Sequence, residues 1–182
     1  MADNPMKLKK TVVLVGMMGC GKTAVGRAVA AKLGIDLLDS DQEIVEAATM
    51  SIAEIFERDG EGFFRDRETE VIRRLLESRV GVLSTGGGAF MSSRNRDIIS
   101  KFGVSVWLDA DLELLWSRVK HKDTRPLLRT PDPKATLAEI FNERVPLYSK
   151  ADLVVKAKPE YAISDMATAV IEALKTRPDV LE

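Results

Sequence analysis

One short glycine-rich motif constrains the fold of this chain more than any other feature. Residues 16–23 read GMMGCGKT, which fits the pattern G-x-x-x-x-G-K-[ST]. An apolar run at 11–15 precedes the motif and a helical pattern at 22–33 follows it, so it joins a buried strand to a helix. In such a loop, successive backbone N–H groups point inward, and the helix adds the positive end of its dipole. The motif therefore predicts a site for the phosphates of a nucleoside triphosphate.

The length and composition are those of one globular domain. A chain of 182 residues can bury about 70% of the surface that its unfolded form exposes. We expect a single domain over residues 1–182, with a core at about 11–175. Hydrophobic residues make up 45% of the chain, more than a disordered chain would have. The formal net charge of -1 gives no overall attraction to nucleic acid or to an anionic membrane, so we expect neither as a partner.

Cysteine usage and apolar runs bear on the compartment. Cys20 is the single cysteine, which excludes an internal disulfide and a thiolate zinc cluster and fits a reducing compartment. The lysines of MADNPMKLKK are not followed by the apolar segment of a signal peptide. Every apolar run in the sequence is shorter than the roughly 20 residues of a membrane-spanning helix. The expected location is therefore the cytoplasm.

Strand and helix patterns alternate along the chain. Apolar runs predict strands at 11–15, 35–38, 80–85, 104–108 and 152–155. Helical patterns are found at 22–33, 42–48, 51–59, 63–79, 111–120, 136–144 and 165–174. Residues 121–135 are rich in charge and proline and lack periodicity, which favours a mobile lid. This order predicts an α/β sandwich of three layers, in which helices cover both faces of a parallel sheet.

Within the phosphate loop, individual residues suggest individual roles. Lys22 would reach the β- and γ-phosphates, and the Thr23 hydroxyl would hold a Mg²⁺ ion that bridges them. Cys20 occupies a variable position of the motif. Its thiol is either an inert bystander, which we favour, or a reactive group beside the inward-pointing N–H groups.

Acidic residues follow two of the predicted strands. Asp39 and Asp41 lie in a turn after the second strand, which is either an ordinary turn or part of a ligand site at the carboxyl end of the sheet. Asp109 follows the fourth strand, as the magnesium-binding aspartate of many P-loop proteins does. Asp109 and Asp111 also directly precede a helix, and we favour a role as N-caps.

Further motifs resemble those of the shikimate kinase family. A phosphate loop alone does not separate a kinase from a GTPase switch or a mechanical ATPase, although the N-K-x-D guanine motif does not occur in the sequence. The family's motifs follow in its order as DSD at 39–41, FRDRE at 64–68, STGGGAF at 84–90, RPLL at 125–128 and RVPLY at 144–148. The resemblance extends from Val12 to about Ala173. It implies a P-loop NTPase fold with a five-stranded parallel sheet and a lid. It also implies transfer of the ATP γ-phosphate to the 3-hydroxyl of shikimate.

The same resemblance implies roles for the residues that would bind shikimate. Asp41 would bind the hydroxyl groups and either orient them or accept a proton. Arg65, the backbone of Gly87, and Arg144 would hold the substrate, and Glu68 would support the arginines. Paired donors of arginine match a carboxylate in a way that lysine cannot reproduce, so these residue types suit a small acid that bears hydroxyls.

The resemblance also assigns residues around the nucleotide. Arg125 in the lid would close over the phosphates and, with Lys22 and Asp41, take part in catalysis, although the sequence alone fits a solvated surface arginine equally well. Arg118 would lie near the adenine, and Asp39 would help to hold Mg²⁺ through water. The remaining nucleotide contacts would come from the loop residues Gly19, Cys20, Gly21, Lys22, Thr23 and Ala24.

Two other functions compete with this interpretation. The nearest is a P-loop kinase of another small acceptor, such as gluconate or a nucleoside monophosphate, because arginines clamp phosphate as well as carboxylate. A second is a regulatory switch that binds the nucleotide without phosphorylating a metabolite. The FRDRE and RVPLY motifs favour the shikimate kinase interpretation over both alternatives, with ATP and shikimate as the partners of a monomeric enzyme.

Overall fold

A five-stranded sheet, in which every neighbouring pair of strands is parallel, forms the centre of the molecule. The structure is a computed structural model that describes residues 6–121 and 128–182. The strands are β1 (Thr11–Val15), β2 (Leu37–Asp39), β3 (Val82–Ser84), β4 (Gly103–Asp109) and β5 (Leu153–Lys156). Their order is β2-β3-β1-β4-β5, and the central β1 is buried along its whole length. The predicted five-stranded parallel sheet is confirmed.

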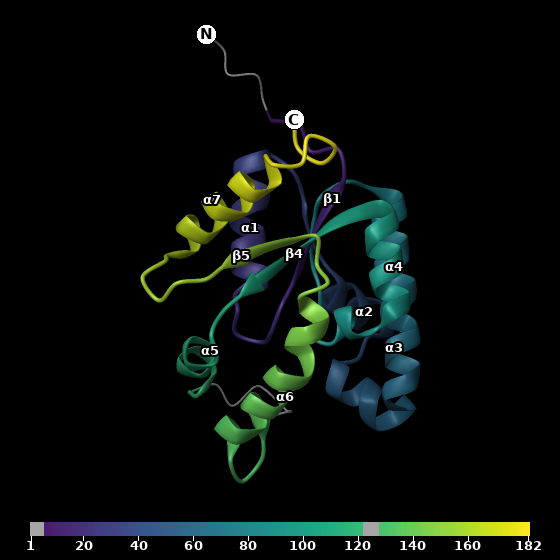
Figure 1. The fold of residues 1–182 in the computed structure, drawn as a ribbon. Coiled ribbons are helices and arrows are strands. Elements are labelled where there is room, and N and C mark those ends of the chain that lie inside the picture. Colours follow the sequence, from purple (N-terminus) through teal and green to yellow (C-terminus); the bar gives the residue numbers. More distant parts are fainter. Residues whose placement is uncertain (1–5, 122–127) are drawn as a thin grey trace.

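Helices cover both faces of the sheet (Figure 1). One face carries α1 (Lys22–Leu33) and α7 (Ile163–Leu174), which pack against each other. The other face carries α4 (Ser93–Phe102), against which α3 (Ile52–Ser78) packs. The remaining helices are α2 (Ser40–Ala48), the short 3-10 helix η1 (Ala89–Met91), α5 (Leu112–Val119) and α6 (Pro133–Tyr148). This arrangement confirms the predicted three-layer α/β sandwich.

Several helix ends lie where local chemistry predicts them. At the end of α1, Gly34 takes the left-handed conformation (φ 65°) and its N–H bonds back to the last turn. At the start of α3, the Ser51 side chain accepts a hydrogen bond from the N–H of Glu54 at 3.1 Å. Gly60, with φ 86°, interrupts the same helix at the predicted stop. Short-range signals therefore set these boundaries.

Other elements differ from the sequence-based prediction. Helix α4 was not predicted, because its first turn is polar, although Ser92 caps it by accepting from the N–H of Asn95 at 3.3 Å. Helix α6 is longer than predicted and continues through Pro146, while residues 133–135 at the end of the predicted lid form its first turn. The strand predicted at 35–38 is found two residues later as Leu37–Asp39.

The two ends of the described chain lie together. Leu8 and Leu181 form an antiparallel bridge, and the Lys7 N–H donates to the carbonyl oxygen of Glu182 at 2.7 Å. The Lys9 ammonium lies 2.7 Å from the Glu182 side chain. Figure 1 shows both ends of the described chain at the same end of the molecule. Among the described residues, none of the helices is long and apolar enough to cross a lipid bilayer.

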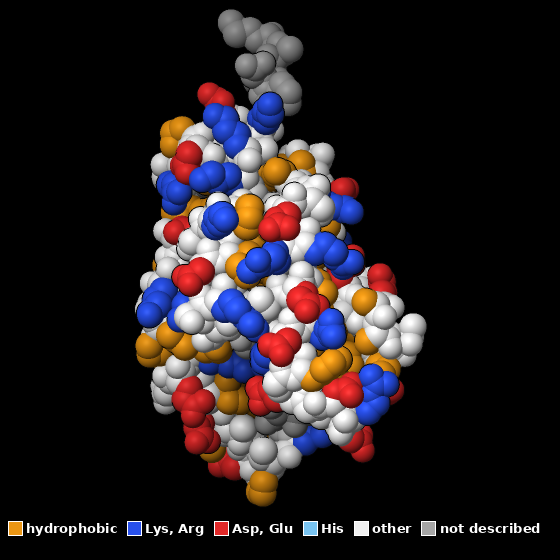
Figure 2. Space-filling model, turned by 90° about the vertical axis from the view of Figure 1, so that its right-hand side faces the viewer, with side chains coloured by type: hydrophobic (Ala, Val, Ile, Leu, Met, Phe, Trp, Pro, Cys, Tyr) orange, Lys and Arg blue, Asp and Glu red, His pale blue; other side chains and the backbone are white. Residues whose placement is uncertain are grey.

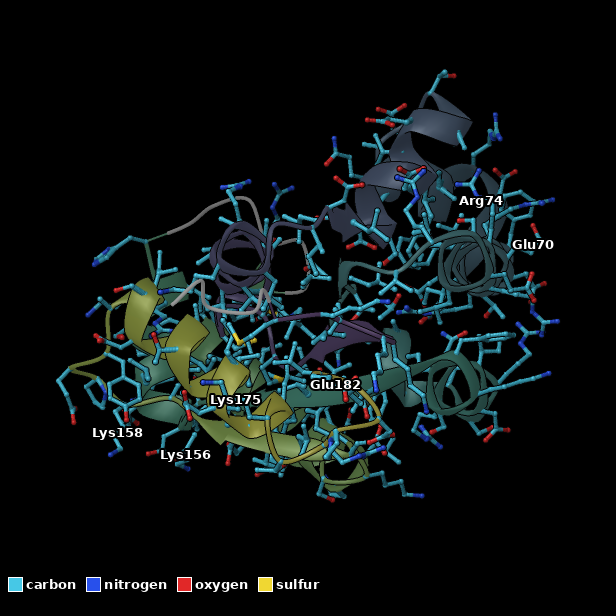
Figure 3. The ribbon with its side chains drawn as sticks, turned by 90° about the horizontal axis from the view of Figure 1, so that it is seen from above. Glu70, Arg74, Lys156, Lys158, Lys175 and Glu182 are labelled. Carbon is cyan, nitrogen blue, oxygen red and sulfur yellow. The ribbon has the colours of Figure 1, made fainter. Side chains whose placement is uncertain are left out.

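Charges of both signs are mixed over the surface. On the face shown in Figure 2, lysine and arginine side chains alternate with aspartate and glutamate. Seen from above in Figure 3, Arg74 of α3 lies on the opposite side of the molecule from Lys175, which follows α7. Arg74 pairs with Glu43 at 3.1 Å and Lys175 with Glu172 at 3.0 Å. This mixture agrees with a net charge close to zero.

Candidate active site

A cavity of about 580 Å³ lies where β1, β2 and β3 end. Ligands of open parallel sheets gather at these carboxyl ends. The cavity is lined by Met18, Gly19, Gly21, Lys22, Thr23, Ala24, Asp39, Asp41, Ser84, Thr85, Gly86, Gly87, Arg118 and Ile163. Most of the residues that the sequence nominated for the nucleotide and for the metal are therefore brought together in one cavity.

The phosphate loop closes around its own lysine. Gly19 and Gly21 take left-handed conformations, with φ 83° and 93°, which a residue with a Cβ adopts only with strain. The ammonium of Lys22 donates to the carbonyl oxygens of Gly16 at 2.7 Å and Met17 at 3.2 Å. The glycines thus permit a tight curve, and Lys22 lies across it at the edge of the cavity.

Cys20 lies beneath this loop rather than in the cavity. Its side chain is buried, and its sulfur lies 3.7 Å from the Lys22 ammonium. Its N–H donates to the carbonyl oxygen of Met17 at 3.1 Å. Burial of the thiol supports the bystander interpretation, because reactive cysteines are accessible to reagents.

Two oxygen-bearing side chains stand beside the loop. The Thr23 hydroxyl is 3.4 Å from the hydroxyl of Ser84, at the end of β3. Asp39, at the end of β2, accepts a hydrogen bond from the N–H of Gln42 at 3.1 Å and so caps α2. Asp39 also lines the cavity. The turn and ligand interpretations of Asp39 are therefore compatible.

Three consecutive glycines, residues 86–88, each face a different charged group. A Cβ added to the first would lie 2.8 Å from Asp41 Oδ1. On the second it would lie 2.8 Å from Arg144 Nη1, and on the third 2.5 Å from Arg65 Nη2. All three distances are shorter than real Cβ contacts, so side chains here would displace the charged groups. The glycine loop therefore allows one carboxylate and two guanidinium groups to converge.

Two carboxylates near the glycine loop, the half-buried Asp41 and the buried Glu68, have incomplete hydrogen bonding. Glu68 is fully buried, and its Oε1 accepts from Arg65 Nη1 at 2.9 Å. Among the described residues, Asp41 Oδ1 and Glu68 Oε2 are buried side-chain oxygens without a hydrogen-bond partner. Burial raises the pKa of Asp41, as does the nearby charge of Asp39. Burial also raises the pKa of Glu68, and Arg65 opposes this effect. Buried side-chain oxygens are usually hydrogen-bonded, so these two are candidates for a catalytic or ligand-binding role.

Tyr148 is a contact of the glycine loop to which the sequence gave no role. Its side chain is fully buried, and its hydroxyl donates to the carbonyl oxygen of Gly87 at 2.6 Å. Burial raises the pKa of Tyr148 to about 12, so the hydroxyl keeps its proton at neutral pH. Tyr148 follows Arg144 by four residues on α6, a spacing that places both on one helix face. That spacing within RVPLY was the signal available in the sequence.

Comparison with known proteins identifies the family. The family model described as shikimate kinase matches residues 18–175. The chain belongs to the shikimate kinase family. A shikimate kinase of Ruegeria pomeroyi is 66% identical, over 96% of this chain and 90% of its own. One of Cereibacter sphaeroides is 60% identical, over 97% of this chain and 88% of its own. The solved structure of a shikimate kinase from Acinetobacter baumannii in complex with shikimate is 37% identical, covers 92% of this chain and 93% of its own, and has a TM-score of 0.86. The predicted P-loop NTPase fold is thereby confirmed.

In this member of the shikimate kinase family, the far wall of the cavity comes from α5 and α7. Arg118 on α5 donates from Nη1 to the carbonyl oxygen of Gly19 at 3.1 Å. Ile163, the first residue of α7, lines the cavity and is 53% exposed. Arg118 thus lies beside the phosphate loop, and its place near the adenine stays a prediction. Ile163 is an apolar neighbour that the sequence analysis did not single out.

The prediction for the aspartates before α5 is only partly right. Asp111 occupies the N-cap position of α5, but its side chain makes no capping hydrogen bond. It accepts instead from the Lys156 ammonium at 2.8 Å, and Asp109 lies 3.5 Å from the same group. Both carboxylates thus pair with the ammonium of Lys156, at the end of β5, instead of capping the helix. Neither aspartate is among the described residues that line the cavity.

The arginines expected around the substrates fall into two groups. Arg65 and Arg144 meet at the glycine loop, although they come from α3 and α6. Arg125 and the other residues of the predicted lid from 122 to 127 lie outside the described residues. The role of Arg125 therefore stays a prediction from the sequence.

Proposed function

We propose that this protein transfers the γ-phosphate of ATP to the 3-hydroxyl of shikimate, giving shikimate 3-phosphate and ADP for aromatic amino-acid biosynthesis. Membership of the shikimate kinase family supports this reaction. The structural observation that carries it is the glycine loop at residues 86–88, against which Asp41, Arg65 and Arg144 converge. One carboxylate and two guanidinium groups are the groups that a small acid with several hydroxyls requires.

The two arginines would bind the carboxylate of shikimate. A guanidinium group presents paired N–H donors in a plane and can hold a carboxylate through two parallel hydrogen bonds. Arg65 is held from behind by Glu68, at 2.9 Å, so its orientation is fixed before the substrate arrives. Arg144 faces the loop at Gly87, one residue away from the place where Arg65 faces it. The acid would thus be gripped from two sides, with the Gly87 backbone between them.

Asp41 would bind the hydroxyl that is phosphorylated. Its Oδ1 is buried without a hydrogen-bond partner, and a substrate hydroxyl would satisfy it. Asp41 lines the same cavity as Lys22, so a hydroxyl bound there would face the phosphate loop. Asp41 orients this hydroxyl and, in its ionised form, can accept the proton that leaves it.

The phosphate loop would hold the triphosphate. N–H groups of the segment from Gly19 to Ala24, together with the positive end of the α1 dipole, suit the β- and γ-phosphates. Lys22 would exchange its bonds to loop carbonyl oxygens for bonds to phosphate oxygens. Arg118 and Ile163 form the wall beside the loop, where the nucleoside would lie.

The oxygen ligands near the loop fit a magnesium ion that is bound mainly through the nucleotide. Within the described part of the chain, no group of three or more His, Cys, Asp or Glu residues could hold a metal on its own. Thr23 and Asp39 line the cavity and offer the hard oxygen atoms that Mg²⁺ prefers. We infer that these two residues hold Mg²⁺ with phosphate oxygens and water. The ion, when bound, neutralises charge on the β- and γ-phosphates.

We further propose that the enzyme acts in the cytoplasm as a single-domain monomer over residues 1–182. Every described residue of the proposed site comes from one chain and is placed around one sheet. A single buried cysteine suits a reducing compartment. A monomer mass by light scattering at the concentration used for activity assays would support this state.

An acceptor panel tests the proposed reaction. Purified protein is incubated with Mg-ATP and, separately, with shikimate, gluconate, a nucleoside monophosphate or no acceptor, and ADP release is measured. We expect release only with shikimate. Release that does not depend on shikimate would overturn the proposal. ADP release only with gluconate, or only with the nucleoside monophosphate, would reassign the protein to another class of small-molecule kinase.

A further inference from the structure

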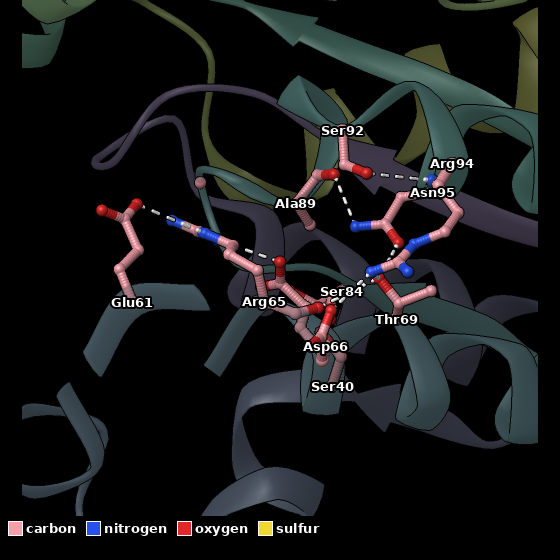
Figure 4. Close-up of polar contacts among 12 residues, drawn as sticks. Ser40, Glu61, Arg65, Asp66, Thr69, Ser84, Ala89, Ser92, Arg94 and Asn95 are labelled. Carbon is pink, nitrogen blue, oxygen red and sulfur yellow. Dashed lines mark hydrogen bonds and ion pairs between the residues drawn. The ribbon is translucent and has the colours of Figure 1, made fainter. Parts of the chain in front are cut away.

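A buried polar chain connects helix α3 to the segment that follows the glycine loop (Figure 4). Asn95 of α4 is 1% exposed, and its Nδ2 donates to the carbonyl oxygen of Ala89 at 2.9 Å. Its Oδ1 accepts from the Thr69 hydroxyl at 2.7 Å. Thr69 lies on α3, and its hydroxyl is also 3.0 Å from the carbonyl oxygen of Arg65. Short polar contacts therefore run from the backbone of Arg65 to the backbone next to Gly88.

The buried contacts through Thr69 and Asn95 are more polar than packing alone requires. Thr69 is 6% exposed, and burying a hydroxyl and an amide is costly unless each finds a partner. Valine and leucine would fill similar volumes without that cost. Hydrogen bonds are directional, however, and apolar contacts are not. A hydrogen-bonded pair fixes the position of α3 relative to the glycine loop more narrowly than an apolar pair would.

We propose that Thr69 and Asn95 are positioning residues for the binding of the acid substrate. They act through Arg65, whose Nη2 would lie 2.5 Å from a Cβ at Gly88. A small shift of α3 against the loop moves this guanidinium relative to the Gly87 backbone and Arg144. Such misplacement weakens a two-sided grip on a carboxylate, whereas the phosphate loop, on another segment, is not affected. The inference rests on the proposed role of Arg65 in binding shikimate.

Two single substitutions each remove the polar groups of one residue of the pair and keep a similar side-chain volume. Thr69→Val deletes the hydroxyl, and Asn95→Leu deletes both polar groups of the amide. We expect each to raise the KM for shikimate roughly fivefold, the effect of about one hydrogen bond, while kcat and the KM for ATP change by less than about twofold. Thr69→Ser keeps the hydroxyl, so its KM for shikimate should stay close to that of the wild type. A merely structural role would lower the melting temperature without this selective change.

Thr168→Val is the matched control. Thr168 is exposed on α7, and its hydroxyl donates to the carbonyl oxygen of Ser164, four residues earlier, at 3.0 Å. The same distance separates the Thr69 hydroxyl from the carbonyl oxygen of Arg65. This variant should keep the wild-type KM for both substrates.

Several outcomes would overturn the positioning role. One is an unchanged KM for shikimate in both folded variants, and another is an equal rise in the KM for ATP. A third is a KM of Thr69→Ser as high as that of Thr69→Val. Insolubility of both Thr69→Val and Asn95→Leu would assign the two residues to folding instead. Wild-type protein that fails to release ADP with shikimate would instead refute the proposed function. The two failures are therefore distinguishable.

Discussion

The two ends of the proposed active site are built in different ways. At the phosphate end, one contiguous segment, residues 16–23, supplies the loop, and Lys22 bonds to carbonyl oxygens of that same segment. At the other end, Asp41, Arg65 and Arg144 come from three helices and meet around the glycine loop. The first end depends on local backbone geometry, and the second depends on how distant elements pack. A substitution at one end should therefore affect mainly the ligand that is bound there.

The two ends also differ in their electrostatics. The phosphate loop offers N–H groups and one ammonium, and the ammonium of Lys22 donates to two carbonyl oxygens of the loop itself. The substrate end buries carboxylates whose pKa values are raised by burial, and two of their oxygens lack partners. Burial of these carboxylate oxygens without partners carries a measurable cost in stability at the substrate end.

The largest effect is expected from Lys22→Met at the phosphate end. Loss of the ammonium removes the positive charge beside the moving phosphoryl group, and we expect kcat to fall about 10²–10³-fold. The dissociation constant of shikimate, measured calorimetrically without nucleotide, should stay unchanged. The control is Lys32→Met at the exposed end of α1. A kcat within tenfold of wild type, or an equal loss of shikimate binding, would remove the separation between the two ends.

Asp41→Asn is expected to lower kcat/KM about 10²-fold, because the amide is a poorer acceptor for the substrate hydroxyl and its proton. The same change should raise the melting temperature at neutral pH. The pKa of Asp41 is higher in the folded than in the unfolded chain. Its contribution to stability is therefore full below the unfolded pKa and is lost as the pH rises through the folded pKa. The amide avoids that loss.

Thermal unfolding at several pH values checks the sign of this effect. The gain in melting temperature of Asp41→Asn over wild type should shrink as the pH falls toward the unfolded pKa, below which the carboxyl is protonated in both states of the chain. Asp97→Asn, on the exposed side of α4, should show no such pH-dependent difference. A lower melting temperature at neutral pH, or an advantage that grows on acidification, would contradict the assignment of a buried charge.

Arg65→Lys and Arg144→Lys test the two-sided grip. Lysine keeps the charge but loses the paired planar donors, so the KM for shikimate should rise about tenfold or more in each variant. The KM for ATP and kcat should change little. The control is Arg67→Lys, which lies on α3 and pairs with Glu70 at the surface. An unchanged KM for shikimate in both lysine variants would remove the proposed substrate site.

The smallest effect is expected from Tyr148→Phe. Only the hydroxyl that donates to the Gly87 carbonyl oxygen is lost, so the free energy of unfolding should fall by about 1 kcal/mol. The KM for shikimate should rise about threefold because the glycine loop is less firmly held, which is a smaller effect than losing one full hydrogen bond. Denaturant titration and initial rates measure both quantities. Tyr161→Phe, on a half-buried tyrosine beyond β5, should change neither. An unaltered stability would show that the hydroxyl is not paired in solution.

The sequence predicted best those features that depend on neighbouring residues. The strand, glycine loop and helix at 11–33 were found because apolar periodicity and loop chemistry act over a few positions. Helix α4 was missed because its first turn is polar and its apolar residues, Ile98 and Ile99, come late. Strand β2 was displaced because a short apolar run does not fix where pairing with β3 begins.

The substrate end was less accessible to prediction from pattern alone. Its residues were nominated by resemblance to a family, since nothing in the spacing of Asp41, Arg65 and Arg144 shows that they meet. The burial of Glu68, the hydrogen bond from Tyr148 to Gly87 and the polar chain through Asn95 join segments that are distant in the sequence. Such contacts are set by tertiary packing, and a single sequence does not display them.

Steady-state kinetics with shikimate and with its methyl ester test most directly the claim that a pair of arginines selects the acid. ATP is kept saturating, and rates of ADP release are compared over a range of acceptor concentrations. The ester retains the hydroxyls but lacks the charged carboxylate, so its KM should exceed that of shikimate by about 10²-fold or more. The KM for ATP should be the same with both acceptors. An ester that is bound and phosphorylated as well as the acid would contradict the claim.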